Sequence, residues 1–112
     1  MLTQADIQKK TAELSKKYGR MKCMEFANDL RDWLVEQKVK GKYLTMSTSN
    51  PRIDYISLDS EPNKVISENG KHYGIEVNGI VYDNFFQDGI RRGDWERSYK
   101  SPVTLKVAFS SF

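Results

Sequence analysis

The 112-residue chain has very little cysteine, histidine or proline: one cysteine, one histidine and three prolines. A single cysteine excludes an internal disulfide, and one cysteine with one histidine is too few for a Cys/His zinc site. We therefore expect no metal and no other cofactor. The sequence leaves Cys23 two roles, that of a buried inert side chain or that of a catalytic thiol.

Long apolar runs are also missing, since no stretch approaches the roughly 18 residues that span a membrane. The start of the chain, residues 1–6, has neither the basic residues nor the apolar stretch of a signal peptide. We expect a domain that is cytosolic, is exported by a route needing no local signal, or is cut from a longer secreted chain. A hydrophobic fraction of 38% with 29% charged residues predicts one folded domain over residues 1–112.

Charge gives a weak indication of a partner. The formal net charge is +3, and basic residues cluster at 16–17, 38–42 and 91–92. A basic surface attracts nucleic acid and other acidic molecules. A solvated charged face is the favoured interpretation, and a phosphate-binding face is the alternative.

Periodicity predicts helices first and strands afterwards. Apolar residues at helical spacing predict helices over about 3–17, with Thr3 as N-cap, and about 22–38. Strands are expected at 43–48, weakly at 54–58, and at 72–77, 80–82 and 103–109, with residues 84–99 irregular. This order predicts an α+β fold with an antiparallel sheet.

Cys23 is expected in the first turn of the second helix, where unpaired amide groups favour an anion. A thiolate is the reactive form of cysteine, and the same amides can hold the oxyanion of an acyl-transfer reaction. Arg20 and Lys22 add positive charge beside it. The competing interpretation is burial, since Cys23 also falls on the apolar stripe of the helix.

His72 opens a predicted strand, on the side opposite its core-facing neighbours. The Asn78-Gly79 pair is typical of a two-residue hairpin, which would place Asp83 opposite about Gly74 and one diagonal step from His72. A carboxylate there can fix the tautomer of the imidazole. Asn84 is the substitute if Asp83 merely ends the strand.

Three segments together resemble the papain fold toxin 2 family of bacterial polymorphic toxins. They are Tyr18-Gly19-Arg20-Met21-Lys22-Cys23-Met24-Glu25-Phe26-Ala27, Gly70-Lys71-His72-Tyr73-Gly74-Ile75 and Val81-Tyr82-Asp83-Asn84. Gly89-Ile90-Arg91 and Asp94-Trp95 are also similar to that family, so the resemblance covers about residues 18–99.

The resemblance implies a papain-like fold in which the cysteine-bearing helix packs on the sheet that carries His72 and Asp83. It implies Cys23 as nucleophile, His72 as general base and acid, and Asp83 as the residue that orients it. It also implies use against competing bacteria, delivery as part of a larger secreted effector, action in the target-cell cytoplasm, and an immunity protein that protects the producer.

One departure from the papain pattern affects the expected reaction. Papain-like peptidases place a glutamine a few residues before the cysteine to complete the oxyanion hole, and residues 16–20 contain none. We therefore expect a protease, a deamidase or a related acyl-transfer enzyme acting on a protein. A ribonuclease acting on tRNA or other RNA is the alternative, and a non-catalytic binding domain is the third hypothesis.

An aromatic and basic stretch follows Asp83. Its aromatic residues are expected to pack a long loop onto the sheet. The functional alternative is a surface for a substrate or the immunity protein, for which Trp95, Arg91 and Arg92 are the candidates.

Overall fold

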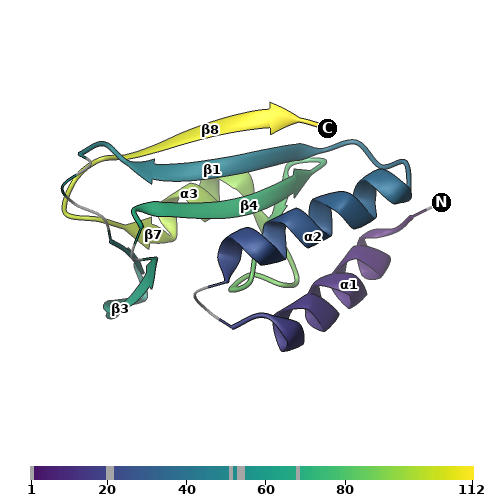
Figure 1. The fold of residues 1–112 in the computed structure, drawn as a ribbon, viewed down its shortest axis with the longest axis horizontal. Helices are drawn as coiled ribbons and strands as arrows, with labels where there is room; N and C mark the ends of the chain where they lie inside the picture. Colours follow the sequence, from purple (N-terminus) through teal and green to yellow (C-terminus); the bar gives the residue numbers. More distant parts are fainter. Residues whose placement is uncertain (1, 20–21, 51, 53–54, 68) are drawn as a thin grey trace.

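Two helices begin the computed structural model, which describes residues 2–19, 22–50, 52, 55–67 and 69–112. Helix α1 spans Gln4–Lys17 and α2 spans Cys23–Glu36 (Figure 1). The expected N-cap of α1 is confirmed, because Thr3 and Asp6 form a complete capping box. The start of α2 is different: Lys22 is its N-cap residue and makes no side-chain capping bond.

The strands form two antiparallel sheets. The larger has the order β6-β5-β4-β1-β8, and the smaller has the order β3-β2-β7. A short helix, α3, spans Arg92–Arg97 and lies across the larger sheet from α1 and α2 (Figure 1). The strands are β1 (Lys42–Thr48), β2 (Ile56–Leu58), β3 (Glu61–Ser67), β4 (Lys71–Val77), β5 (Ile80–Tyr82), β6 (Ile90–Arg91), β7 (Tyr99–Lys100) and β8 (Leu105–Ser111).

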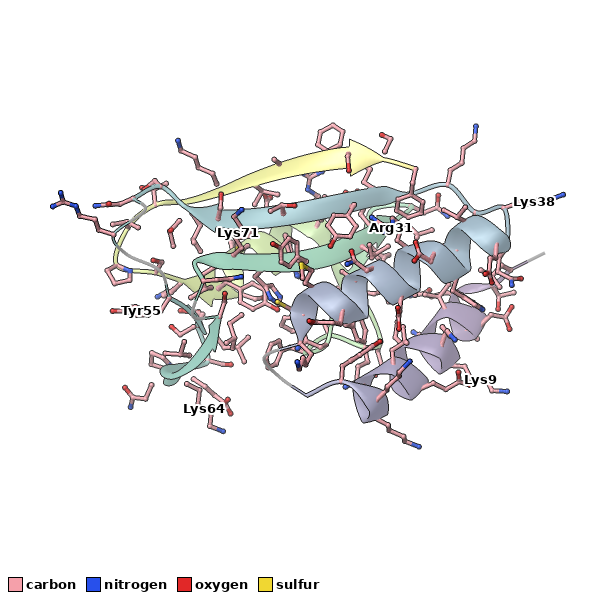
Figure 2. The ribbon with its side chains drawn as sticks, in the orientation of Figure 1. Lys9, Arg31, Lys38, Tyr55, Lys64 and Lys71 are labelled. Carbon is pink, nitrogen blue, oxygen red and sulfur yellow. The ribbon has the colours of Figure 1, made fainter. Side chains whose placement is uncertain are left out.

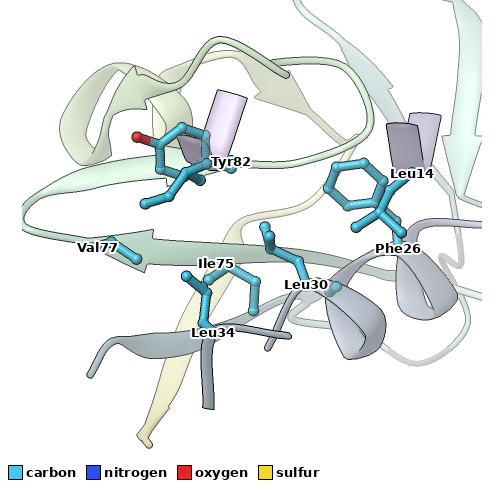
Figure 3. Packing of buried hydrophobic residues seen from close by; sticks show 9 residues of the cluster. Leu14, Phe26, Leu30, Leu34, Ile75, Val77 and Tyr82 are labelled. Carbon is cyan, nitrogen blue, oxygen red and sulfur yellow. The ribbon is translucent and has the colours of Figure 1, made fainter. Parts of the chain in front are cut away.

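One face of the larger sheet is covered by α1 and α2. Leu30 and Leu34 of α2 point at Ile75 of β4, and Leu14 of α1 meets Phe26 at the other end of the same cluster (Figure 3). These side chains are at most 5% exposed. The apolar stripe expected for α2 is therefore a real packing surface, and it fixes the start of α2 beside β4.

The opposite face of the sheet covers a second core, which contains the functional candidates. Leu44 and Met46 of β1 pack there with Ile66, Trp95 and Tyr99. Because side chains alternate along a strand, His72 and Gly74 of β4 lie on this face while Tyr73 and Ile75 lie on the other. His72 accordingly points away from the helical core, as the sequence predicts, and is fully buried.

The α+β class is confirmed, but the second half of the chain is more ordered than the sequence predicts. The stretch 84–99, expected to be irregular, contains β6, α3 and the first residue of β7. These elements are too short to produce a periodic pattern, and long-range pairing stabilises them: β6 pairs with β5, and β7 pairs with β2. The second sheet was predicted only in part: β2 overlaps the weak strand expected at 54–58, whereas β3 and β7 were not expected.

The surface charges are spread around the molecule. Lys9 of α1, Lys38 in the turn after α2 and Lys64 of β3 extend outward at separate places in Figure 2. Within the described residues, no helix has the length and apolar character needed to cross a membrane.

Candidate active site

The site lies where β5 separates from β4. The two strands pair only over Ile75–Val77 of β4, with Ile75 opposite Tyr82. This register is the one the Asn78-Gly79 hairpin predicts, and it places the next residue, Asp83, near Gly74. Beyond that point β4 continues to His72 without β5 beside it, so the edge is open to other side chains.

Asp83 is fully buried and holds five hydrogen-bond donors. Its Oδ1 accepts from the main-chain N–H groups of Phe85 and Phe86, each at 2.8 Å. Its Oδ2 accepts from Trp95 Nε1 at 2.7 Å, from His72 Nε2 at 2.8 Å and from the Tyr99 hydroxyl. Such a saturated carboxylate can remain ionised without solvent.

The charges of the pair follow from these bonds. Burial alone would raise the pKa of Asp83, but the hydrogen bonds from His72, Tyr99 and Trp95 hold that pKa below its usual value. Burial likewise opposes protonation of His72, but the bond to Asp83, followed by the nearby Cys23 side chain, raises the pKa of His72 to about 9. Burial and the Asp83 charge raise the pKa of Tyr99, so its hydroxyl stays a donor.

These bonds also decide which nitrogen of His72 is available for chemistry. Asp83 is an acceptor only, so Nε2 carries a proton and donates it. Nδ1 is buried and has no hydrogen-bond partner among the described residues. In the neutral ring, Nδ1 is therefore the basic atom.

Cys23 lies near the imidazole of His72. It is close enough to contribute to the raised pKa of His72, although Nδ1 shows no bond of hydrogen-bonding geometry. We interpret the contact as electrostatic, since catalytic hydrogen bonds are often long in unliganded enzymes. Aromatic rings surround His72, with Tyr99 at 4.5 Å, Phe85 at 6.0 Å and Trp95 at 6.1 Å between centroids.

Cys23 is the first residue of α2, and a pocket opens beside it. The side chain is 7% exposed and unpaired with any other cysteine. Lys22, the N-cap residue of α2, makes no side-chain capping bond, and we interpret the amides of the first turn as available to a group bound in the pocket. The pocket has a volume of about 230 Å³, and its described lining consists of Cys23, Met24, Glu25, Ile66, Ser67, Asn69 and Tyr73.

The other candidate residues from the sequence lie in different environments. Lys22 is exposed directly before Cys23, and Arg20 lies outside the described residues. Asn84 is buried next to Asp83, and it is Asp83 that bonds His72. Arg91 is exposed, while Arg92 forms an ion pair with Glu76 at 3.1 Å.

The surface role suggested for Trp95 is wrong. Trp95 is fully buried, and its indole N–H is committed to Asp83. The physical reason is α3, the helix missing from the sequence interpretation, which turns this side chain inward onto Gly74. An added Cβ at Gly74 would lie 3.0 Å from Trp95 Cζ2, so the glycine makes room for the indole.

Sequence reasoning missed three polar residues near the site. Tyr99 lies far along the chain, and a tyrosine carries no local signal of a buried hydroxyl. Ser67 and Asn69 belong to a polar stretch that carries no sequence pattern linking it to Cys23. The one available indication that they belong to the site was their closeness to His72 in the sequence.

Chemically, the arrangement provides a thiol, a base with one free nitrogen, and a buried carboxylate that orients the base. Among the described residues, no group of three or more His, Cys, Asp or Glu side chains is placed to hold a metal ion. The site therefore has the components of nucleophilic catalysis by cysteine.

A cysteine-bearing helix that packs on an antiparallel sheet carrying the histidine and aspartate defines a papain-like protein. The model of the family called papain fold toxin 2 matches residues 6–100, so the chain belongs to this family. By its family, it is a toxin effector domain. No curated protein and no solved structure gives a significant match.

Proposed function

We propose that this domain is a toxin enzyme that attacks an amide of a protein through Cys23, as a protease, a deamidase or a related acyl-transfer enzyme. The observation that carries the proposal is the buried His72–Asp83 pair, which lies near Cys23 and whose Nδ1 has no partner among the described residues. Three segments of the chain contribute these side chains, and the aromatic packing around them keeps water out of the pair.

In the proposed reaction, the thiol proton of Cys23 already resides on Nδ1 of His72, in keeping with the raised pKa of the imidazole, and the Cys23 sulfur attacks the carbonyl carbon. A C–S bond forms, and the carbonyl oxygen becomes an oxyanion beside the first-turn amides of α2. Collapse breaks the C–N bond, and the nitrogen leaves with the proton from His72. Water then hydrolyses the thioester, or another nucleophile takes the acyl group. Asp83 stays ionised and holds the ring in place.

The pocket favours acyl chemistry over RNA cleavage. Its described lining contains one charged side chain, Glu25, and no lysine or arginine. Proteins that bind nucleic acid neutralise its phosphates mainly with lysine and arginine side chains. The net charge of +3 is the feature that favours the ribonuclease, and none of the described basic residues lines this pocket.

Membership of the toxin family supports proposals about the partners and the delivery of this domain. We propose that a dedicated immunity protein binds this domain in the producing cell. We also propose that the domain is delivered within a larger effector, for use against competing bacteria, and acts in the target-cell cytoplasm.

The first test is toxicity on induced expression in a bacterium. We expect Cys23→Ala, Cys23→Ser and His72→Ala to abolish growth inhibition. Removal of either the nucleophile or its base costs several orders of magnitude in rate. Glu36→Ala, at the exposed far end of α2, is the matched control and should remain toxic. Circular dichroism of each variant confirms folding.

Different outcomes separate the hypotheses. Full toxicity of Cys23→Ala with loss in His72→Ala would overturn the thiol mechanism in favour of the ribonuclease. If all three variants remained toxic, the non-catalytic binding domain would be the remaining hypothesis. Alkylation of Cys23 by iodoacetamide near pH 6 is a direct chemical check: it should exceed that of a small model thiol and should slow in His72→Ala.

A further inference from the structure

The polar turn between β3 and β4 forms one wall of the Cys23 pocket. Ser67 ends β3, Asn69 follows it, and both line the pocket opposite the first turn of α2. This position matters because residues 16–20 provide no glutamine to help bind an oxyanion. A second donor, if present, must come from another part of the chain.

The hydrogen bonds of the turn fix the orientation of the Asn69 amide. The Lys71 main-chain N–H donates to Asn69 Oδ1 at 3.1 Å, and the Ser67 hydroxyl donates to the same oxygen at 2.7 Å. A main-chain N–H can only donate, so the atom that it meets is the oxygen of the amide. The Nδ2 group is thereby assigned without ambiguity to the opposite side of the amide.

Asn69 is an exposed residue, and its Nδ2 donors are free within the described part of the chain. No acceptor within the described part of the chain takes a hydrogen bond from Asn69 Nδ2, although its Oδ1 has two partners. Ser67 Oγ is committed differently, since its proton is shared between Asn69 Oδ1 and the Lys71 carbonyl. Tyr73 and Glu25 complete the polar lining, and neither is an amide donor. Asn69 is therefore the side-chain amide donor that this pocket contains.

We propose that Asn69 is a catalytic residue that donates a hydrogen bond from Nδ2 to the oxyanion formed when Cys23 attacks a carbonyl. The main-chain N–H of Cys23, at the uncapped start of α2, supplies the other donor. Ser67 and the Lys71 N–H are positioning groups that hold the amide. This inference rests on the proposed thiol mechanism and assigns the oxyanion site within it.

Two reactions of the same thiol separate this role from any effect on the thiol itself. Attack on p-nitrophenyl acetate forms an S–acetyl bond, breaks the ester C–O bond, releases p-nitrophenolate and passes through an oxyanion. Alkylation by iodoacetamide displaces iodide at a saturated carbon and forms no oxyanion. A donor to the oxyanion affects only the first reaction.

We expect Asn69→Ala to slow acetylation of Cys23 on the order of 10²-fold, the cost of one oxyanion donor, with alkylation unchanged. Asn69→Asp keeps the acceptor that Ser67 and Lys71 need but has no amide donor, so it should slow acetylation at least as much with the turn intact. Asn63→Ala, exposed on β3, is the matched control and should leave both rates unchanged. Release of p-nitrophenolate and mass spectrometry of the alkylated protein give the two rates.

The outcomes are distinct. Unchanged acetylation in both Asn69 variants would overturn the assignment, and so would an equal fall in acetylation and alkylation, because Asn69 would then act on the thiol. If the unsubstituted protein reacts with the ester no faster than Cys23→Ala, the proposed function itself fails, and the oxyanion assignment fails with it.

Discussion

At the scale of single residues, Asp83 is the group on which the site depends. It holds one histidine and two uncharged donors in a fixed cluster, since Oδ2 accepts from His72, Trp95 and Tyr99 together. Hydrogen bonds to a buried charge contribute about 1.5–3 kcal/mol each, so the cluster stabilises both the fold and the orientation of the imidazole.

The Tyr99 hydroxyl tests this dependence without emptying the core. We expect Tyr99→Phe to keep the aromatic packing but to destabilise the protein by about 1.5–3 kcal/mol, because Asp83 loses a buried donor. Activity should fall while the protein remains folded, since His72 is held less firmly. Urea unfolding and toxicity measure the two effects. Tyr55→Phe, with an exposed ring, should change neither, and an unaltered Tyr99→Phe protein would contradict the role of the hydroxyl.

At the scale of elements, the two helices are built for different tasks. Helix α1 has a full capping box and an acidic first turn, which satisfy its start internally. Helix α2 lacks a capping side chain and begins at Cys23. An uncapped start costs stability, and we interpret it as the feature that leaves amide donors for a reacting group.

Strand β4 meets α3 at Gly74, and this contact gives a prediction for the element. In Gly74→Ala, the new Cβ would lie 2.8 Å from Val81 Cγ1 and 3.0 Å from Trp95 Cζ2, so the indole must move from Asp83. We expect a loss of about 1–3 kcal/mol and reduced activity. Gly19→Ala is the control, because nothing lies within 4 Å of its added Cβ. Equal urea midpoints for the two variants would contradict the proposed packing.

How far the sequence predicts these elements depends on the range of the interactions. The hairpin at Asn78-Gly79 and the cap at Thr3 are local, and both were predictable. The proximity of His72 and Asp83 followed from the hairpin register alone. By contrast, α3 and the burial of Trp95 depend on contacts with β4 and β5 across the fold. The position of Asn69 beside Cys23 depends on how α2 packs against the sheet, which no local pattern encodes.

At the scale of the whole molecule, the His72–Asp83 pair predicts how stability changes with pH. The folded state keeps the His72 proton up to a pKa of about 9, whereas the unfolded chain loses it near its ordinary value of about 6.5. Stability from this group is therefore complete below about pH 6.5 and is lost as pH rises toward 9. The lowered pKa of Asp83 acts in the opposite sense, so its contribution is lost on acidification below about pH 3.9.

Urea midpoints between pH 5 and 9 test this dependence. His72 is the one histidine of the chain, so the decline above pH 6.5 should become much shallower in His72→Gln. An equally steep decline in both proteins would show that another group causes it. Measurements in a Cys23→Ala background separate the imidazole from the thiol.

The separation of β5 from β4 after Ile75 has a consequence for how this domain comes into being. The open edge contains no complete set of reactive groups until α2, the turn at Asn69 and the segment from Asp83 to Tyr99 have all arrived. On the proposed thiol mechanism, an unfolded or partly synthesised chain has a thiol and an imidazole but no assembled site. We therefore expect activity to appear only with folding, and an extended chain to be harmless to the cell that handles it.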